Sequence, residues 1–127
     1  MQCRGIRGAI RVSANNRTGI LAASKKLLSR MVKVNELETE DIAAILFTTT
    51  PDLDAEFPAA ATRELGWPSN LALLCGHEMN VPHALPLCLR VLMLVNTEKE
   101  PDEIIHVYIG EARKLKDKSS PAIGGDA

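Results

Sequence analysis

The sequence predicts an α+β fold in which a mixed sheet of five strands is combined with two main helices. Its 127 residues are enough for one domain with a sizeable core and too few for a second domain of similar size. Five segments show the alternation or the short apolar runs typical of strands, and two show apolar residues at helical spacing. Two helices leave part of such a sheet uncovered, so we expect one apolar face that an oligomer buries.

The first strand and the first helix are predicted near the N-terminus. Residues 3–12 alternate, with aliphatic side chains on one face and Arg7 on the other, between the small residues Gly5 and Ala9. Asn15-Asn16 then predicts a turn. The next segment is predicted to be an amphipathic surface helix, because its apolar residues recur at helical spacing: Ile20, Leu21, Leu27, Leu28 and Met31.

A second strand and a second helix follow. Residues 45–48 are typical of a strand, which ends where Thr50-Pro51-Asp52 begins a loop. Pro58 favours the first turn of a helix over residues 59–65, and Gly66 favours its C-terminal end.

Three more strands complete the expected sheet. Residues 71–75 predict a short buried strand and residues 87–95 a longer one. The last strand is predicted over residues 105–109, with Ile105, Val107 and Ile109 facing inward and His106 and Tyr108 facing outward.

Residues 116–127 have the composition of a flexible tail, so residues 1–115 form the expected single domain.

Composition and charge limit the classes of function. A formal net charge of -1 and an aromatic content of 3% argue against nucleic acid as a partner. Three cysteines without a CxxC pair, Cys3, Cys75 and Cys88, indicate free thiols in a reducing cytoplasm. The longest apolar stretch, residues 81–95, is interrupted by polar residues and is shorter than the roughly 20 residues of a membrane helix. We therefore expect a soluble protein with no membrane partner.

The common catalytic motifs are absent. The chain has no Walker loop, no GxGxxG, no GxSxG and no HExxH. His77, His83 and His106 are too scattered to favour a zinc site, so no metal is expected. Cys75 lies two residues before His77, which leaves a thiol nucleophile as an alternative, although no third orienting group is evident.

Arg90 carries the strongest indication of function, because the surrounding residues 87–95 are otherwise apolar. Burying an unpaired charge costs several kcal/mol, so Arg90 needs a carboxylate from the chain or an anionic ligand. Glu78 is the candidate partner within the chain. An Arg90 paired only with a protein carboxylate would argue against a ligand.

Other polar residues lie at predicted strand ends or on small-residue faces. Guanidinium groups bind carboxylates bidentately, so converging arginines with one acid and one phenol describe a pocket for a small polyanion with a hydroxyl group. Taken singly, Arg7 and Arg63 are better explained as solvated or salt-bridged surface side chains, and Tyr108 can be explained as an aromatic residue of an edge strand. With Arg90, the set is Arg7, Arg63, Cys75, Glu78 and Tyr108.

The order and spacing of these residues resemble those of the monofunctional chorismate mutases of the trimeric pseudo-α/β-barrel class, the AroH class. The resemblance covers residues 4–115. The segments that carry it are Arg4-Gly5-Ile6-Arg7-Gly8-Ala9, Thr50-Pro51-Asp52-Leu53, Phe57-Pro58-Ala59, Arg63-Glu64-Leu65, Cys75 with Glu78-Met79, Leu89-Arg90-Val91 and His106-Val107-Tyr108.

The resemblance implies a homotrimer whose sheets face the threefold axis, with helices outside and active sites between subunits. It also implies the rearrangement of chorismate to prephenate, in phenylalanine and tyrosine biosynthesis, without a cofactor. In this pericyclic reaction the ether C–O bond breaks ahead of C–C bond formation, so negative charge gathers on the ether oxygen. No proton moves, which agrees with the absence of an evident acid–base pair.

The resemblance further implies a role for each site residue. Arg90 would donate to the ether oxygen, Arg7 and Tyr108 would hold the side-chain carboxylate, and Glu78 would accept from the ring hydroxyl near Cys75. The remaining substrate-binding residues would be Phe57, Ala59 and Arg63 from the neighbouring chain, together with Leu74 and Leu115.

Two positions depart from the family pattern. Ala60 stands where some members have lysine, and Lys116 stands where arginine is common. We expect both departures to alter substrate affinity more than the chemical step. We also expect the tail from Lys116 to order over the pocket only when ligand is bound.

Two other classes of function remain open. A non-catalytic trimeric binder of small carboxylates would need Arg7 and Arg63 but would have no use for Arg90 and Glu78. A trimeric imine or enamine deaminase of similar shape would also use an arginine at the subunit interface. That family lacks the segment from Cys75 to Glu78, which disfavours it.

Overall fold

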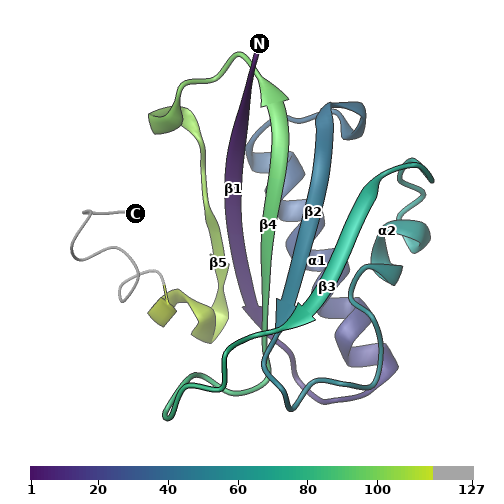
Figure 1. Cartoon of the computed structure of the whole chain (residues 1–127), viewed down its shortest axis with the longest axis vertical. Coiled ribbons are helices and arrows are strands. Elements are labelled where there is room, and N and C mark those ends of the chain that lie inside the picture. Colours follow the sequence, from purple (N-terminus) through teal and green to yellow (C-terminus); the bar gives the residue numbers. More distant parts are fainter. Residues whose placement is uncertain (116–127) are drawn as a thin grey trace.

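The computed structural model describes residues 1–115, and these form a mixed sheet of five strands in the order β3-β2-β4-β1-β5 (Figure 1). The central strand β4 is antiparallel to both of its neighbours, whereas the outer strands β3 and β5 run parallel to theirs. The predicted α+β fold with a mixed five-stranded sheet is confirmed. The strands are β1 Gln2–Arg11, β2 Ile42–Thr49, β3 Ala72–His77, β4 Cys88–Thr97 and β5 Val107–Ile109.

The two predicted helices are present, but they differ greatly in size. Helix α1 (Arg17–Val34) lies behind the sheet in Figure 1, and the side chain of Asn16 caps its N-terminus by accepting from the Gly19 N–H. Helix α2 (Ala60–Glu64) has only five residues and lies beside the β3 edge. It ends before Gly66, which has a φ of +75° that glycine tolerates without strain. Short 3-10 turns occur at η1 (Thr39–Asp41), η2 (Pro101–Glu103) and η3 (Gly110–Ala112).

The core of the described residues lies between α1 and one face of the sheet. A close approach between α1 and β1 is possible because position 8 is glycine. A Cβ atom built there would lie 2.6 Å from Sδ of the fully buried Met31 and 3.1 Å from Cδ1 of Leu27. The aliphatic face predicted for the first strand therefore packs directly on the helix.

The opposite face of the sheet has no helix over it within residues 1–115. Leu74, Leu46, Leu92 and Arg7 form one row across β3, β2, β4 and β1 on this open face. Leu74 is 65% exposed and Leu92 is 38% exposed. The expectation of an uncovered apolar face is confirmed for this chain. The prediction that residues 71–75 form a buried strand is wrong, because β3 is an edge strand and most of its residues are exposed.

The last strand is shorter than predicted, and Ile105 does not face inward. Ile105 is 50% exposed, and β5 starts only at Val107, which is buried. The reason is Asn35, a buried residue at the end of α1. Its side chain accepts from the Ile105 N–H at 2.8 Å and donates to the Ile105 carbonyl at 2.9 Å. An asparagine side chain thus replaces the neighbouring strand as the partner of this backbone.

We predict that Asn35→Ala destabilises the protein by about 2–4 kcal/mol, because it leaves partly buried backbone groups of Ile105 and the Met31 carbonyl without their partner. Denaturant unfolding at a fixed protein concentration measures the change. The exposed residue Asn96 provides the control, since Asn96→Ala is expected to change the free energy of unfolding by no more than about 0.5 kcal/mol. Equal effects of both substitutions would contradict the role given to Asn35.

Candidate active site

A row of residues in register across the sheet brings the polar side chains of the open face together. Tyr108 on β5, Ala9 on β1, Arg90 on β4 and Thr48 on β2 are successive neighbours in this row. Ala9 is small and lines the same cavity as the tyrosine and the arginine. Arg7 lies two residues before Ala9 on the same face, because side chains alternate along a strand.

Four predicted site residues line a single cavity on this face. The cavity has a volume of about 330 Å³, and its walls include Arg7, Glu78, Arg90 and Tyr108. Two cations, one carboxylate and one phenol therefore meet as the sequence predicted. These groups come from three strands and from the segment that follows β3, so only the sheet register could bring them together.

Glu78 is held at the end of β3 by two hydrogen bonds. Its backbone N–H donates to the Thr49 carbonyl at 2.7 Å, and its carboxylate accepts from the Thr48 hydroxyl. Thr48 also lines the cavity. Sequence reasoning missed Thr48, although the alternation along β2 places it on the same face as the directly opposed Arg90.

The expectation that Arg90 is buried is wrong, although Arg90 does pair with Glu78, its candidate partner within the chain. Its side chain is 45% exposed, and its Nε lies 3.7 Å from Oε2 of Glu78. The apolar neighbours that suggested burial, Leu89 and Val91, point into the core on the other side of the strand. The contact with Glu78 is an ion pair without a direct hydrogen bond, since 3.7 Å exceeds hydrogen-bond length. Pairing with a protein carboxylate counts against a ligand, so the argument for a ligand now depends on the shared cavity and on the missing direct hydrogen bond, and no longer on burial.

A second cavity of about 810 Å³ adjoins the first, because Glu78 and Arg90 line both. Its other walls include the segment 81–86, Lys114 and Leu115. Leu115, a predicted substrate-binding residue, therefore lines the cavity next to the one that holds Arg7 and Tyr108. The lining of the two cavities together contains three cationic side chains, Arg7, Arg90 and Lys114, and one carboxylate, that of Glu78. The lining as a whole therefore favours an anion.

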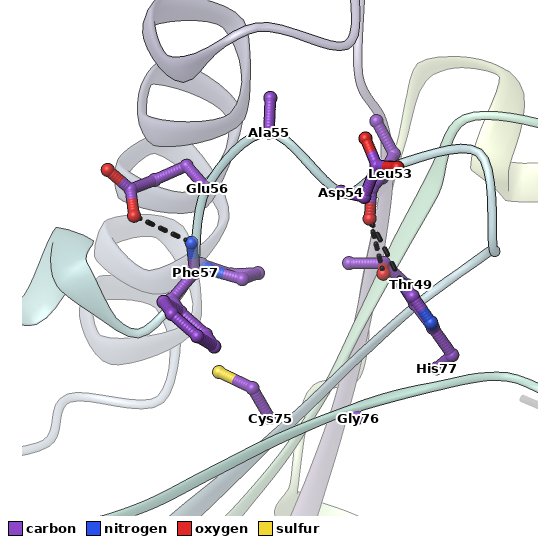
Figure 2. A pocket seen from close by; sticks show the side chains of 10 residues that line it. Thr49, Leu53, Asp54, Ala55, Glu56, Phe57, Cys75, Gly76 and His77 are labelled. Atoms are coloured by element: carbon purple, nitrogen blue, oxygen red, sulfur yellow. Dashed lines mark hydrogen bonds between the residues drawn. The ribbon is translucent and has the colours of Figure 1, made fainter.

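A separate group of predicted site residues surrounds a third cavity, of about 380 Å³, on the other side of the sheet (Figure 2). It is lined by Phe57 and Cys75, and Figure 2 shows the Cys75 sulfur directed toward the Phe57 ring. The backbone of Ala59 hydrogen-bonds to the Cys75 thiol. Phe57 is 71% exposed, and Arg63 on α2 is exposed as well.

Within one chain the structure does not bring Cys75 near Glu78. Cys75 is paired in register with Phe47, which is buried on the helix side of the sheet, whereas Arg7 and Arg90 lie on the open face. The alternation of side chains along β3 forces this separation. Leu74 lies on the open face, but it is at the edge strand and outside the lining of the cavity. The predicted residues thus divide into two groups on different surfaces.

The thiols are poor candidates for nucleophiles. Burial raises the pKa of the Cys75 thiol, and a backbone hydrogen bond at Ala59 only partly opposes this effect. Burial also raises the pKa of Cys88, against the opposing influence of the Arg90 guanidinium. The neutral thiol is therefore favoured at both positions, which argues against covalent cysteine catalysis. In residues 1–115 no group of three or more histidine, cysteine, aspartate or glutamate residues is placed to hold a metal ion.

The described part of the chain contains no helix that is both long and apolar enough to cross a membrane.

Comparisons with known proteins agree with this geometry. A chorismate mutase from Thermus thermophilus is 42% identical over 114 residues, which cover 89% of this chain and 93% of the relative. A chorismate mutase from Bacillus subtilis is 41% identical over 117 residues, 91% of each chain. The solved structure of a chorismate mutase from Clostridium thermocellum is 48% identical, with a TM-score of 0.86 over 88% of this chain and 99% of that one.

The family model described as chorismate mutase type I matches residues 3–119, nearly the whole chain. Its match includes every residue of the two groups described above. The chain therefore belongs to the type I chorismate mutase family.

Proposed function

We propose that this chorismate mutase converts chorismate to prephenate in sites that neighbouring subunits of a homotrimer share. The observation that supports the proposal most directly is the cavity in which Arg7, Arg90, Tyr108 and Glu78 meet. The separate position of the Phe57 and Cys75 group supports the sharing, because one chain alone cannot close the pocket with both groups.

The reaction needs a donor at the ether oxygen, where negative charge develops as the C–O bond breaks. Arg90 provides this donor, because it lies at the centre of the row and its guanidinium makes no direct hydrogen bond to Glu78. One preorganised donor at a developing oxyanion contributes about 2.7–4 kcal/mol. Natural enzymes commonly lower the barrier by at least about 8 kcal/mol, so Arg90 is the largest single contributor but is not sufficient.

The remaining stabilisation comes from holding the substrate in its compact reactive conformer. Arg7 and Tyr108 bind the side-chain carboxylate, while Glu78 accepts from the ring hydroxyl. Because these groups lie on rigid strands or next to their ends, the ligand meets a fixed geometry at little further entropic cost. The chemistry is unimolecular, so positioning and charge complementarity are all that the protein must supply.

The second group of residues closes the pocket from the neighbouring subunit. Phe57 and Ala59 form part of the wall, Cys75 lies beside them, and Arg63 adds a further cation. Exposed Phe57, Leu74 and Leu92 give each chain apolar surface that association would bury. A cyclic trimer is a closed arrangement in which each chain gives one group to each of two sites.

Further expectations belong to this proposal. Residues 1–115 act as a single domain, and the free cysteines suit a reducing cytoplasm as the location. The effect of Ala60, the first residue of α2, is expected on substrate affinity. Lys116 and the tail 116–127 lie outside the described residues, so what is expected of them stays a prediction. Amide exchange with and without prephenate can test the expected ordering of the tail.

We predict that Arg90→Ala lowers kcat about 100- to 1,000-fold while the trimer stays intact, because the donor to the ether oxygen is lost. Chorismate consumption, with prephenate identified as the product, measures the effect, and size-exclusion chromatography reports the assembly. Arg30→Ala, which removes an exposed arginine on α1, is the control and leaves kcat unchanged. A nearly normal kcat for Arg90→Ala would remove the basis of the proposed mechanism.

Shared sites predict complementation between inactive variants. Arg90→Ala and Arg63→Ala damage opposite halves of the site, so a mixed trimer contains one site in which both halves are intact. Random reassembly of equal amounts would restore about one quarter of the sites. Activity after joint unfolding and refolding is the measurement, with each variant refolded alone as its control. Activity no higher than the mean of the two variants would show that each chain carries a complete site.

A further inference from the structure

The segment that leads into β4 has an unusual backbone conformation at its last residue, Leu87. Leu87, three residues before Arg90, has a φ of +52°. A leucine in the left-handed region is unfavourable by roughly 1–2 kcal/mol, so the surroundings must hold it there. The preceding residues 81–86 form a wall of the larger cavity that Arg90 lines. The conformation at Leu87 therefore sets the direction in which the chain passes from this wall of the cavity into β4.

The side chain of Asp52, in the loop that follows the neighbouring strand β2, holds this conformation. Its two carboxylate oxygens accept from the Leu87 N–H at 3.2 and 3.0 Å. Oδ1 also accepts from the Thr50 hydroxyl at 2.5 Å, and the oxygen of that hydroxyl accepts from the Cys88 N–H at 3.0 Å. The side chains of Asp52 and Thr50 are hydrogen-bonded to each other. Together they thus bind the N–H groups of Leu87 and Cys88, which are consecutive at the start of β4.

These bonds extend the pairing of β2 and β4 beyond the point where their ladder ends. The last residues in register are Thr49 and Leu89, next to the pair formed by Thr48 and Arg90. Beyond them, the Thr50 N–H donates to the Cys88 carbonyl at 3.0 Å, and Asp52 takes the next free N–H. On the other side, the Val12 N–H donates to the Leu87 carbonyl at 2.7 Å. Arg90 therefore lies just inside a closed set of hydrogen bonds that fixes this end of its strand.

We infer that Asp52 is a positioning residue for catalysis, which fixes the start of β4 and thereby the placement of the Arg90 guanidinium. The inference rests on the proposed role of Arg90 and adds a residue that touches no substrate, since Asp52 lines none of the cavities described above. A displacement of about 1 Å at a catalytic group can lower the rate about 100-fold. A substitution at Asp52 therefore needs to shift the Arg90 guanidinium only slightly to lower the rate.

Substitutions at Asp52 test the inference through kcat and KM separately. Asp52→Ala is expected to lower kcat roughly 10- to 100-fold with less than about a threefold change in KM, because the ether oxygen donor acts mainly in the transition state. Asp52→Asn retains most of the kcat, since its one carbonyl oxygen can replace Oδ1, which accepts from both Leu87 and Thr50. The exposed Asp102 in η2 is the matched control, and Asp102→Ala changes neither constant.

A double-variant cycle distinguishes positioning from a general structural effect. If Asp52 acts through Arg90, then Asp52→Ala costs little further kcat in an Arg90→Ala background. Equal losses in both backgrounds, or a loss that appears only in KM or in the melting temperature, would overturn the inference and leave the proposed function standing. An unimpaired Arg90→Ala would instead overturn the proposed function itself. Should Asp52→Ala fail to fold, Asp52→Ser and Asp52→Asn provide the same comparison.

Discussion

The alternation of side chains along β4 is the constraint on which the rest of the structure depends. As the central strand, β4 is paired on both sides, so its register cannot shift without breaking two ladders. Leu89, Val91 and Met93 enter the core and are at most 3% exposed. The same pleat turns Arg90 toward the open face. The position of the cation is thus fixed by the burial of its neighbours, which is a rigid way to hold the group proposed to act in catalysis.

A single long helix explains why one face of the sheet stays open in the described residues. Helix α1 covers one face of the sheet, and the five-residue α2 is too short to cover the other. The open face carries the Arg7 and Arg90 cavity, while the Phe57 and Cys75 cavity lies on the helix side near α2. An association that buries the apolar part of the open face would also bring one group of each type together. Assembly and active-site formation would then share the same apolar surface.

The sequence predicted what depends on local pattern and missed what depends on distant partners. Strand periodicity located β1, β2 and β4, and it placed Arg7 and Tyr108 on the side away from the core. It could not show that β3 lies at an edge, that Asn35 binds the backbone of Ile105, or that Thr48 binds Glu78. The two side-chain contacts join residues 30 and 70 positions apart that meet only through the fold. The apolar run around Arg90 was a true signal of a core strand, but burial of its neighbours does not imply burial of Arg90.

If the residues act as proposed, the arrangement of Thr48, Glu78 and Arg90 resolves an electrostatic difficulty of the site. A carboxylate bound directly to Arg90 would neutralise the donor that the reaction needs and would have to be displaced by substrate. Here the Thr48 hydroxyl donates to the same Oε2 of Glu78 that faces Arg90, and the arginine Nε stays 3.7 Å away. Glu78 therefore has a neutral hydrogen-bond donor on the adjacent strand as well as its ion pair with Arg90. Arg90 keeps its capacity for charge-assisted hydrogen bonds, which are about twice as strong as neutral ones. The carboxylate needed for the ring hydroxyl can thus stand beside the cation needed for the ether oxygen without disabling it.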